Sequence, residues 1–289
     1  MKRLVACFST LALATGPALA APPPPSIWTG FYLGLNIGGV AGTSTGANTN
    51  GYSVYDWAAS ALGMPFGFSS PYRGGHASLS PQSGVLGGFQ LGYNYQAAPN
   101  FVLGVEADFQ GTSLAGAGST YSLAGATDEE LITHLQNGVV DVKAGVGWLG
   151  TVRGRIGYLA TPSILLFGTG GLAYGNTYAN VNSYGRHWHP GHEEGHPENP
   201  VTPTWNNIDA VNVGWTVGGG AEWAFLENWS AKAEALYFDL GSLTVRGQYS
   251  PLINPAAPYS IAIVNAAATT VNYRGVIARL GVNYRFDWR

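Results

Sequence analysis

Eight stretches of the chain have the composition of β-strands, and their spacing constrains the fold more than any other feature of the sequence. Seven of them alternate between apolar and non-apolar residues, which predicts strands because successive side chains of a strand point to opposite faces. The other, 163–177, is nearly apolar on both faces, which leaves its register open. All eight are long enough to cross a bilayer as tilted strands. The predicted strands are residues 28–40, 84–96, 101–112, 145–160, 163–177, 210–225, 229–247 and 271–286.

The connections between these strands alternate between short and long. Three contain 4, 2 and 3 residues, and the other four contain 43, 32, 32 and 23 residues. This is the pattern of a barrel with tight turns at one rim and loops at the other. We therefore predict an all-β fold, an eight-stranded antiparallel up-and-down transmembrane β-barrel with four long extracellular loops.

Composition excludes several other classes of protein. Only 10% of the residues are charged and 42 of 289 are glycine, whereas soluble domains carry about 25% charge and about 7% glycine. An aromatic content of 12% argues against disorder, one cysteine against a disulfide scaffold, and a net charge of −3 against a basic nucleic-acid binder. A helical membrane protein is also excluded, because no run of 18 apolar residues occurs.

Periodicity alone does not say which face of the barrel is inside. In a soluble barrel of the lipocalin kind the apolar face would point inward around a ligand. The low charge and the mixture of acids and bases on the polar face favour the membrane alternative instead. So do the aromatic residues near the strand ends, which resemble the girdles of membrane interfaces: Trp28, Phe31, Tyr32, Tyr93, Tyr95, Trp148, Tyr158, Trp223, Phe225, Trp229, Tyr284 and Phe286.

The polar face is expected to fill the barrel with ion pairs. Eight strands leave an interior just wide enough for side chains, whereas a general-diffusion pore needs about 16 strands. The network either only fills the barrel or borders a narrow, gated water path. No nucleophile or metal set accompanies the glutamates, so we predict no enzyme. The predicted interior residues are Glu106, Asp108, Arg153, Arg155, Glu222, Lys232, Glu234, Arg279 and Arg285.

The first twenty residues have the form of a secretory signal peptide. A basic start at Lys2 and Arg3 precedes an apolar segment, and Ala18-Leu19-Ala20 is the small-x-small pattern that signal peptidase cleaves. The segment is too short for a transmembrane anchor. We predict a signal peptide at 1–20, a Pro-rich leader at 21–27 and one barrel domain at 28–289, exported by the Sec pathway to the outer membrane.

A histidine-rich segment lies in the third long connection. Neutral imidazole ligates zinc, copper, nickel and haem iron, and short His-rich tracts often bind metal. Three interpretations stay open: a solvated polar loop, weak metal or hemin binding in which Trp188 or Tyr184 stacks on the porphyrin, and acid sensing. No other cofactor is expected. The candidate ligands are His187, His189, His192 and His196.

Two other connections carry weaker signals. Residues 41–83 are rich in Gly, Ser, Ala and Asn, which predicts a flexible surface loop or, through its scattered aromatic residues, a binding loop. In the second connection, residues 127–132 form a capping box, which predicts the start of a short helix.

Several blocks resemble the strands of small outer-membrane β-barrel proteins of Gram-negative bacteria, a family that includes OmpA-like and opacity-type barrels and hemin-binding surface proteins. The blocks fall in the first seven predicted strands and cover little of the long connections. In sequence order the blocks are WTGFYLG at 28–34, GGFQLGYNY at 87–95, GVEAD at 104–108, TVRGRIGY at 151–158, GGLAYG at 170–175, GGGAE at 218–222 and AEALY at 233–237.

This resemblance implies an outer-membrane protein with an envelope-structural or surface-interaction role. In some members it implies a narrow porin-like channel or hemin or metal capture, so these stay as alternatives. The expected partners are outer-membrane lipid and lipopolysaccharide, the barrel assembly machinery and host or surface ligands, and not nucleic acid. Two features depart from the family pattern. Three residues follow the aromatic Phe286, and no peptidoglycan-binding domain is expected after the barrel.

Overall fold

The computed structural model describes residues 27–43, 46–59, 64–72, 76–80, 82–127, 133–188, 204–248 and 260–286. The predicted signal peptide and nearly all of the Pro-rich leader lie outside these ranges. Among the described residues no helix could cross a membrane.

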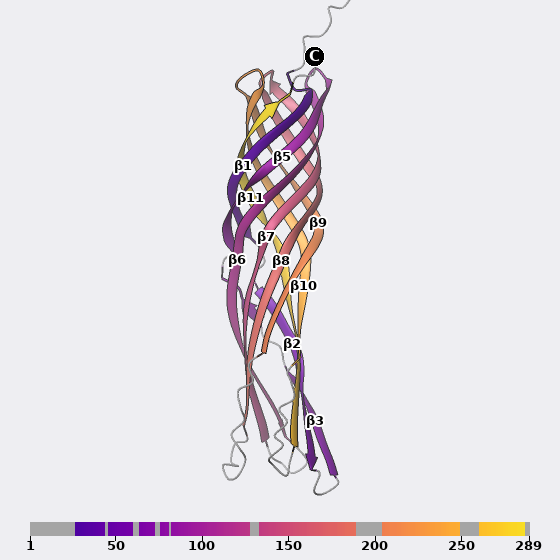
Figure 1. Cartoon of the computed structure of the whole chain (residues 1–289), viewed down its shortest axis with the longest axis vertical. Coiled ribbons are helices and arrows are strands. Elements are labelled where there is room, and N and C mark those ends of the chain that lie inside the picture. Colours follow the sequence, from indigo (N-terminus) through magenta and orange to yellow (C-terminus); the bar gives the residue numbers. More distant parts are fainter. Residues whose placement is uncertain are drawn as a thin grey trace, which may run out of the picture.

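Eight antiparallel strands close into a barrel, as predicted from the sequence. Each strand pairs with the next, and pairing of the first with the last closes the ring (Figure 1). The alternation of side chains confirms the period-two pattern, and residues 164–177 of the segment with open register lie within one strand. The ring consists of β1 (Gly30–Gly42), β5 (Ser83–Ala98), β6 (Phe101–Thr127), β7 (Thr133–Thr161), β8 (Ile164–Trp188), β9 (Thr204–Ala224), β10 (Trp229–Gln248) and β11 (Ser260–Arg285).

Short turns join the strands at one rim, at the top of Figure 1. They comprise residues 99–100, 162–163 and 225–228, close to the three short connections expected from the sequence. In outer-membrane barrels the short turns face the periplasm and the longer connections face outward. By this rule, the short-turn rim of this barrel faces the periplasm and its long connections face outward.

The four long connections are present as predicted, but their described parts are largely strand rather than irregular loop. The described part of 41–83 forms β2 (Gly46–Ala59), β3 (Met64–Tyr72) and β4 (His76–Ser78) rather than a loop. β2 pairs with β11, and β3 pairs with β2. Thr127 is the last residue of β6 rather than the start of a helix, and residues 128–132 lie outside the described residues. Pairing satisfies the backbone groups of these segments, so tertiary context overrides their loop-like composition.

Two girdles of aromatic side chains mark the part of the barrel that lies in the bilayer. At the short-turn rim the rings of Phe101 and Tyr158 are 5.6 Å apart, and farther along the strands those of Phe109 and Trp148 are 5.3 Å apart. The eight residue steps from Phe101 to Phe109 extend about 27 Å along β6. At a tilt of about 40° this is roughly 21 Å along the membrane normal, close to the apolar band of outer-membrane barrels.

The outer surface between the girdles is apolar. Leu35 and Ile37 on β1 are each 70% exposed, and the other strands also present apolar residues, alanine or glycine there. Outward-facing charges begin beyond the second girdle, where Asp239 on β10 lies opposite Arg274 on β11. The apolar face is therefore the outer one, as the membrane alternative requires.

Candidate functional site

The inward faces of five strands bring charged side chains together between the two girdles. All are buried, and none is more than 5% exposed. They include eight of the nine residues predicted for the interior: Glu106 and Asp108 on β6, Arg153 and Arg155 on β7, Glu222 on β9, Lys232 and Glu234 on β10, and Arg279 on β11.

Strand register places acids opposite bases. Glu106 lies directly across from Arg153, and Glu234 lies across from Arg279. Lys232 lies across from Glu222. Directly opposed residues on one face of an antiparallel pair are close enough to interact. Direct pairing therefore accounts for the contacts of Glu106 with Arg153 and of Glu234 with Arg279, and the other contacts of the network cross the closed barrel or run diagonally.

Arg153 is the centre of the network. Its guanidinium donates to Glu234 Oε1 at 2.7 Å, to Asp108 Oδ2 at 2.9 Å and to Glu106. Arg279 reaches two of these acids, with Nη2 at 2.8 Å from Asp108 Oδ2 and Nε at 2.8 Å from Glu234 Oε2. Lys232 Nζ donates to both oxygens of Glu106 at 2.9 Å. Two arginines and one lysine therefore neutralise three carboxylates.

A second pair lies toward the short-turn rim. Arg155 Nη2 donates to Glu222 Oε2 at 2.8 Å, and Ser230 and Asn283 donate to the other oxygen of Glu222. The Arg155 guanidinium also lies 4.1 Å from the centre of the Phe167 ring. With this pair the interior holds four acidic and four basic side chains, so their formal charges cancel.

Arg285 corrects the sequence prediction. It is half-exposed at the short-turn rim, where its guanidinium donates to the backbone carbonyl of Glu227. It lies six residue steps from Arg279, which is about 20 Å along the strand. That separation keeps it out of reach of the central carboxylates.

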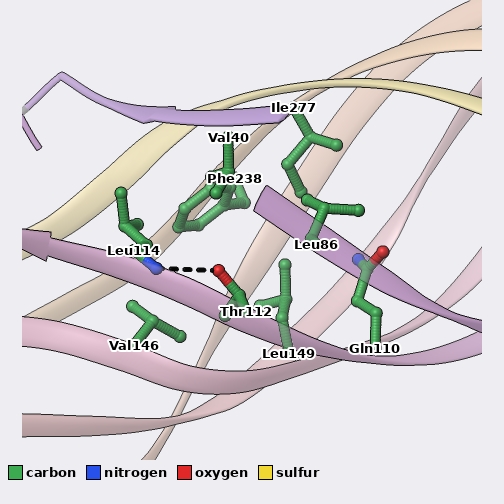
Figure 2. A pocket seen from close by; sticks show the side chains of 9 residues that line it. All are labelled: Val40, Leu86, Gln110, Thr112, Leu114, Val146, Leu149, Phe238 and Ile277. Atoms are coloured by element: carbon green, nitrogen blue, oxygen red, sulfur yellow. Dashed lines mark hydrogen bonds between the residues drawn. The ribbon is translucent and has the colours of Figure 1, made fainter. Parts of the chain in front are cut away.

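Apolar layers cover the charged layer on both sides. Toward the long connections, Val40, Leu149, Phe238 and Ile277 belong to one large buried cluster. Figure 2 shows a cavity among these side chains, whose space for water is only about 10 Å³. This is roughly the space that one water molecule needs.

A tryptophan closes the other side. Trp28 is 2% exposed and packs with Val102, Leu159 and Leu165, while its indole nitrogen donates to the Pro162 carbonyl at 2.9 Å. The sequence prediction for Trp28 was wrong, because it expected an interfacial aromatic. The prediction for Tyr32 was wrong for the same reason: this residue points inward, and its hydroxyl donates to Glu106 Oε2 at 2.6 Å.

Interior amides were missed as well. Gln90 and Gln110 are fully buried, and Gln110 accepts a hydrogen bond from Arg279 at 3.0 Å. Their burial could have been predicted from the sequence, because both occupy inward positions in the alternation of β5 and β6. The list of predicted interior residues left them out because it was restricted to charged side chains.

The family of the chain follows from its sequence relatives. A family model described as outer membrane protein beta-barrel domain matches residues 8–286. The chain belongs to this family. It is 32% identical over 290 residues to the 31 kDa outer-membrane immunogenic protein of Brucella melitensis, covering 98% of this chain and 97% of that protein. These matches confirm the resemblance and place the protein in the outer membrane.

Weaker similarities to other proteins were also found. The 22 kDa outer membrane protein of Rhizobium leguminosarum is 27% identical over 219 residues, covering 76% of this chain and 67% of that protein. Among solved structures, the chain is similar to OprG from Pseudomonas aeruginosa, with a TM-score of 0.36, 12% identity and coverage of 89% and 97%. The family assignment rests on the sequence matches.

Most of the predicted histidine site lies outside the described residues. His187 is near the end of β8, and His189, His192 and His196 fall in the undescribed 189–203. Within the described ranges no group of three or more His, Cys, Asp or Glu side chains could hold a metal ion.

The network gives a prediction for stability. Changing Arg153→Met would leave its carboxylate partners buried with too little positive charge, so we expect the free energy of unfolding to fall by about 3–5 kcal/mol. Arg285→Met removes a half-exposed rim arginine and should cost no more than about 1 kcal/mol. Urea unfolding in lipid vesicles measures both, and equal small effects of the two changes would contradict the central role of Arg153.

Proposed function

We propose that this protein is a non-enzymatic surface protein of the outer membrane, with an envelope-structural or surface-interaction role. Its barrel serves as a closed anchor for the strands that extend outward. The single observation that supports this most is the closed interior, a neutral charged layer covered on each side by apolar side chains.

A water path through this interior would have to pass three successive layers. It would cross the Trp28 cluster, the ion pairs around Arg153 and the apolar cluster that contains Phe238. Separating buried ion pairs is costly, because each isolated charge loses several kcal/mol of solvation. This favours an anchor over the alternative of a narrow channel.

The extension of the strands supports the surface role. β6 continues for eighteen residues beyond Phe109, from the second girdle to Thr127, which is about 60 Å along the strand. β2 and β3 widen the sheet in the same region (Figure 1). The relative from Brucella melitensis is named an immunogenic protein, and a surface position of this chain would agree with that name.

Electrical recording in planar lipid bilayers tests the proposal. We expect the folded protein to give no stable single-channel steps under conditions in which a general porin conducts. Trp28→Ala opens only the layer at the short-turn rim, so this variant should stay silent as well. Regular steps from the unmodified protein would contradict the proposal and favour the narrow channel.

Capture of hemin or metal is a second candidate function. β8 ends at Trp188 and β9 begins at Thr204, so the strands place the ends of the His-rich connection at the long-loop end of the barrel, away from the short-turn rim. A ligand that arrives from outside the cell would meet this end of the barrel first.

Separate titrations with hemin and with zinc test this candidate. The unmodified protein should bind saturably at micromolar concentration, and a variant with His187, His189, His192 and His196 changed to alanine should lose that binding. A matched control changes the other two histidines of the chain, His76 and His134, and should bind as the unmodified protein does. Equal binding by all three proteins would exclude capture by the His-rich segment.

A further inference from the structure

Polar side chains line up across the outer surface of β6, β7, β8 and β9, beyond the second girdle. In one row Ser119, Asp141, Asn182 and Trp205 lie opposite one another on successive strands. The next row contains Lys143, opposite Asn180 on β8, with Asn207 following on β9. We call these two rows the polar grid.

The polar grid faces away from the barrel interior. The residues that alternate with it, Val140, Val142, Ala179 and Val181, are buried. Residues of β6, β7 and β8 in the grid line a shallow groove of about 680 Å³. In the described part of the chain, no hydrogen bond to another side chain is found for the amides of Asn180, Asn182 and Asn207. These amides are available to a ligand.

The grid stands at the height of the lipid headgroups and the saccharides attached to them. Asn180 lies six residue steps along β8 from Tyr174 in the second girdle, which is about 20 Å along the strand. At a tilt of about 40° this corresponds to roughly 15 Å above the girdle. A surface that faces sideways at this height meets neighbouring lipids rather than a ligand arriving at the tips of the strands.

The chemistry of the grid fits sugar hydroxyls. Amide groups both donate and accept hydrogen bonds, as the hydroxyls of a sugar do. Trp205 is 72% exposed at the edge of the grid, opposite Asn182, and offers a flat ring on which the C–H face of a sugar can stack. A few polar groups beside an aromatic surface are a common arrangement of ligand sites.

The charges of the grid do not fit phosphate. Lys143 is accompanied by Asp141 in the neighbouring row and by Asp209 two residues beyond Asn207, so no excess of positive charge is present. Phosphate sites use clusters of arginine and lysine instead. We propose that the polar grid binds the saccharide of lipopolysaccharide in the surrounding outer leaflet, through its hydroxyls rather than its phosphates.

The test uses the core oligosaccharide released from lipopolysaccharide, before and after chemical removal of its phosphates. The full mature protein is folded in a zwitterionic detergent without sugar groups, and binding is followed by calorimetry. One variant changes Asn180 and Asn182 to alanine, and a second carries Trp205→Ala. The matched control changes Ser242 and Asn272, which lie opposite each other on the outer face of β10 and β11.

We expect saturable binding that survives removal of phosphate and becomes about tenfold weaker in each grid variant, with no change in the control. Absence of binding, equal affinity of all variants, or loss of binding with the phosphates would each overturn the proposal. Tighter binding of an unrelated neutral glucan of the same length would show a site for external saccharide and would also overturn it. The change in gel mobility on heating verifies that every variant is folded.

Discussion

The ion pairs around Arg153 are the constraint on which the rest of the barrel depends. Lipid surrounds the wall, so charged side chains at membrane depth must point inward, where each needs a partner of opposite sign. Arg153 meets this need by contacting Glu106, Asp108 and Glu234. Such contacts require the strands to pair in one register, because a slip of one residue would turn the charged side chains toward lipid.

The polarity of the outer surface and that of the interior both reverse at the second girdle. Between the girdles the outside is apolar and the inside is charged, as Val105 and Glu106 illustrate. Beyond the second girdle the outside is polar and the inside is apolar, as Lys143 and Val142 illustrate. The alternation of residues continues without interruption, and only the solvent outside changes from lipid to water. One continuous wall can therefore cross the membrane and extend beyond it.

Much of the fold was predictable because it follows from local pattern. The eight strands, their short turns and the inward position of Glu106 and Arg153 follow from the period of two and the low overall charge. The strand extensions were missed although Val140, Asp141, Val142 and Lys143 alternate in the same way. Their neighbours are rich in Gly, Ser and Ala, and pairing with adjacent strands decides such segments. The particular partners of each charge depend on register, which one sequence does not specify.

The burial of Trp28 was also beyond local pattern. It precedes β1 and lies inside because the barrel mouth offers Val102, Leu159 and Leu165 as packing partners. Only the closed ring brings these three residues together. The same is true of Tyr32, whose place beside Glu106 depends on strands far apart in the sequence.

The proposed anchor requires a charged layer that water-borne solutes cannot enter from either side. The most direct test changes Thr151, a buried neighbour of Arg153, to cysteine and exposes the folded protein to a charged thiol reagent on both sides of a vesicle membrane. Ser242→Cys on the outer surface is the accessible control. We predict that the control reacts and that the cysteine at position 151 reacts only after unfolding. Labelling of both at similar rates would contradict a closed interior.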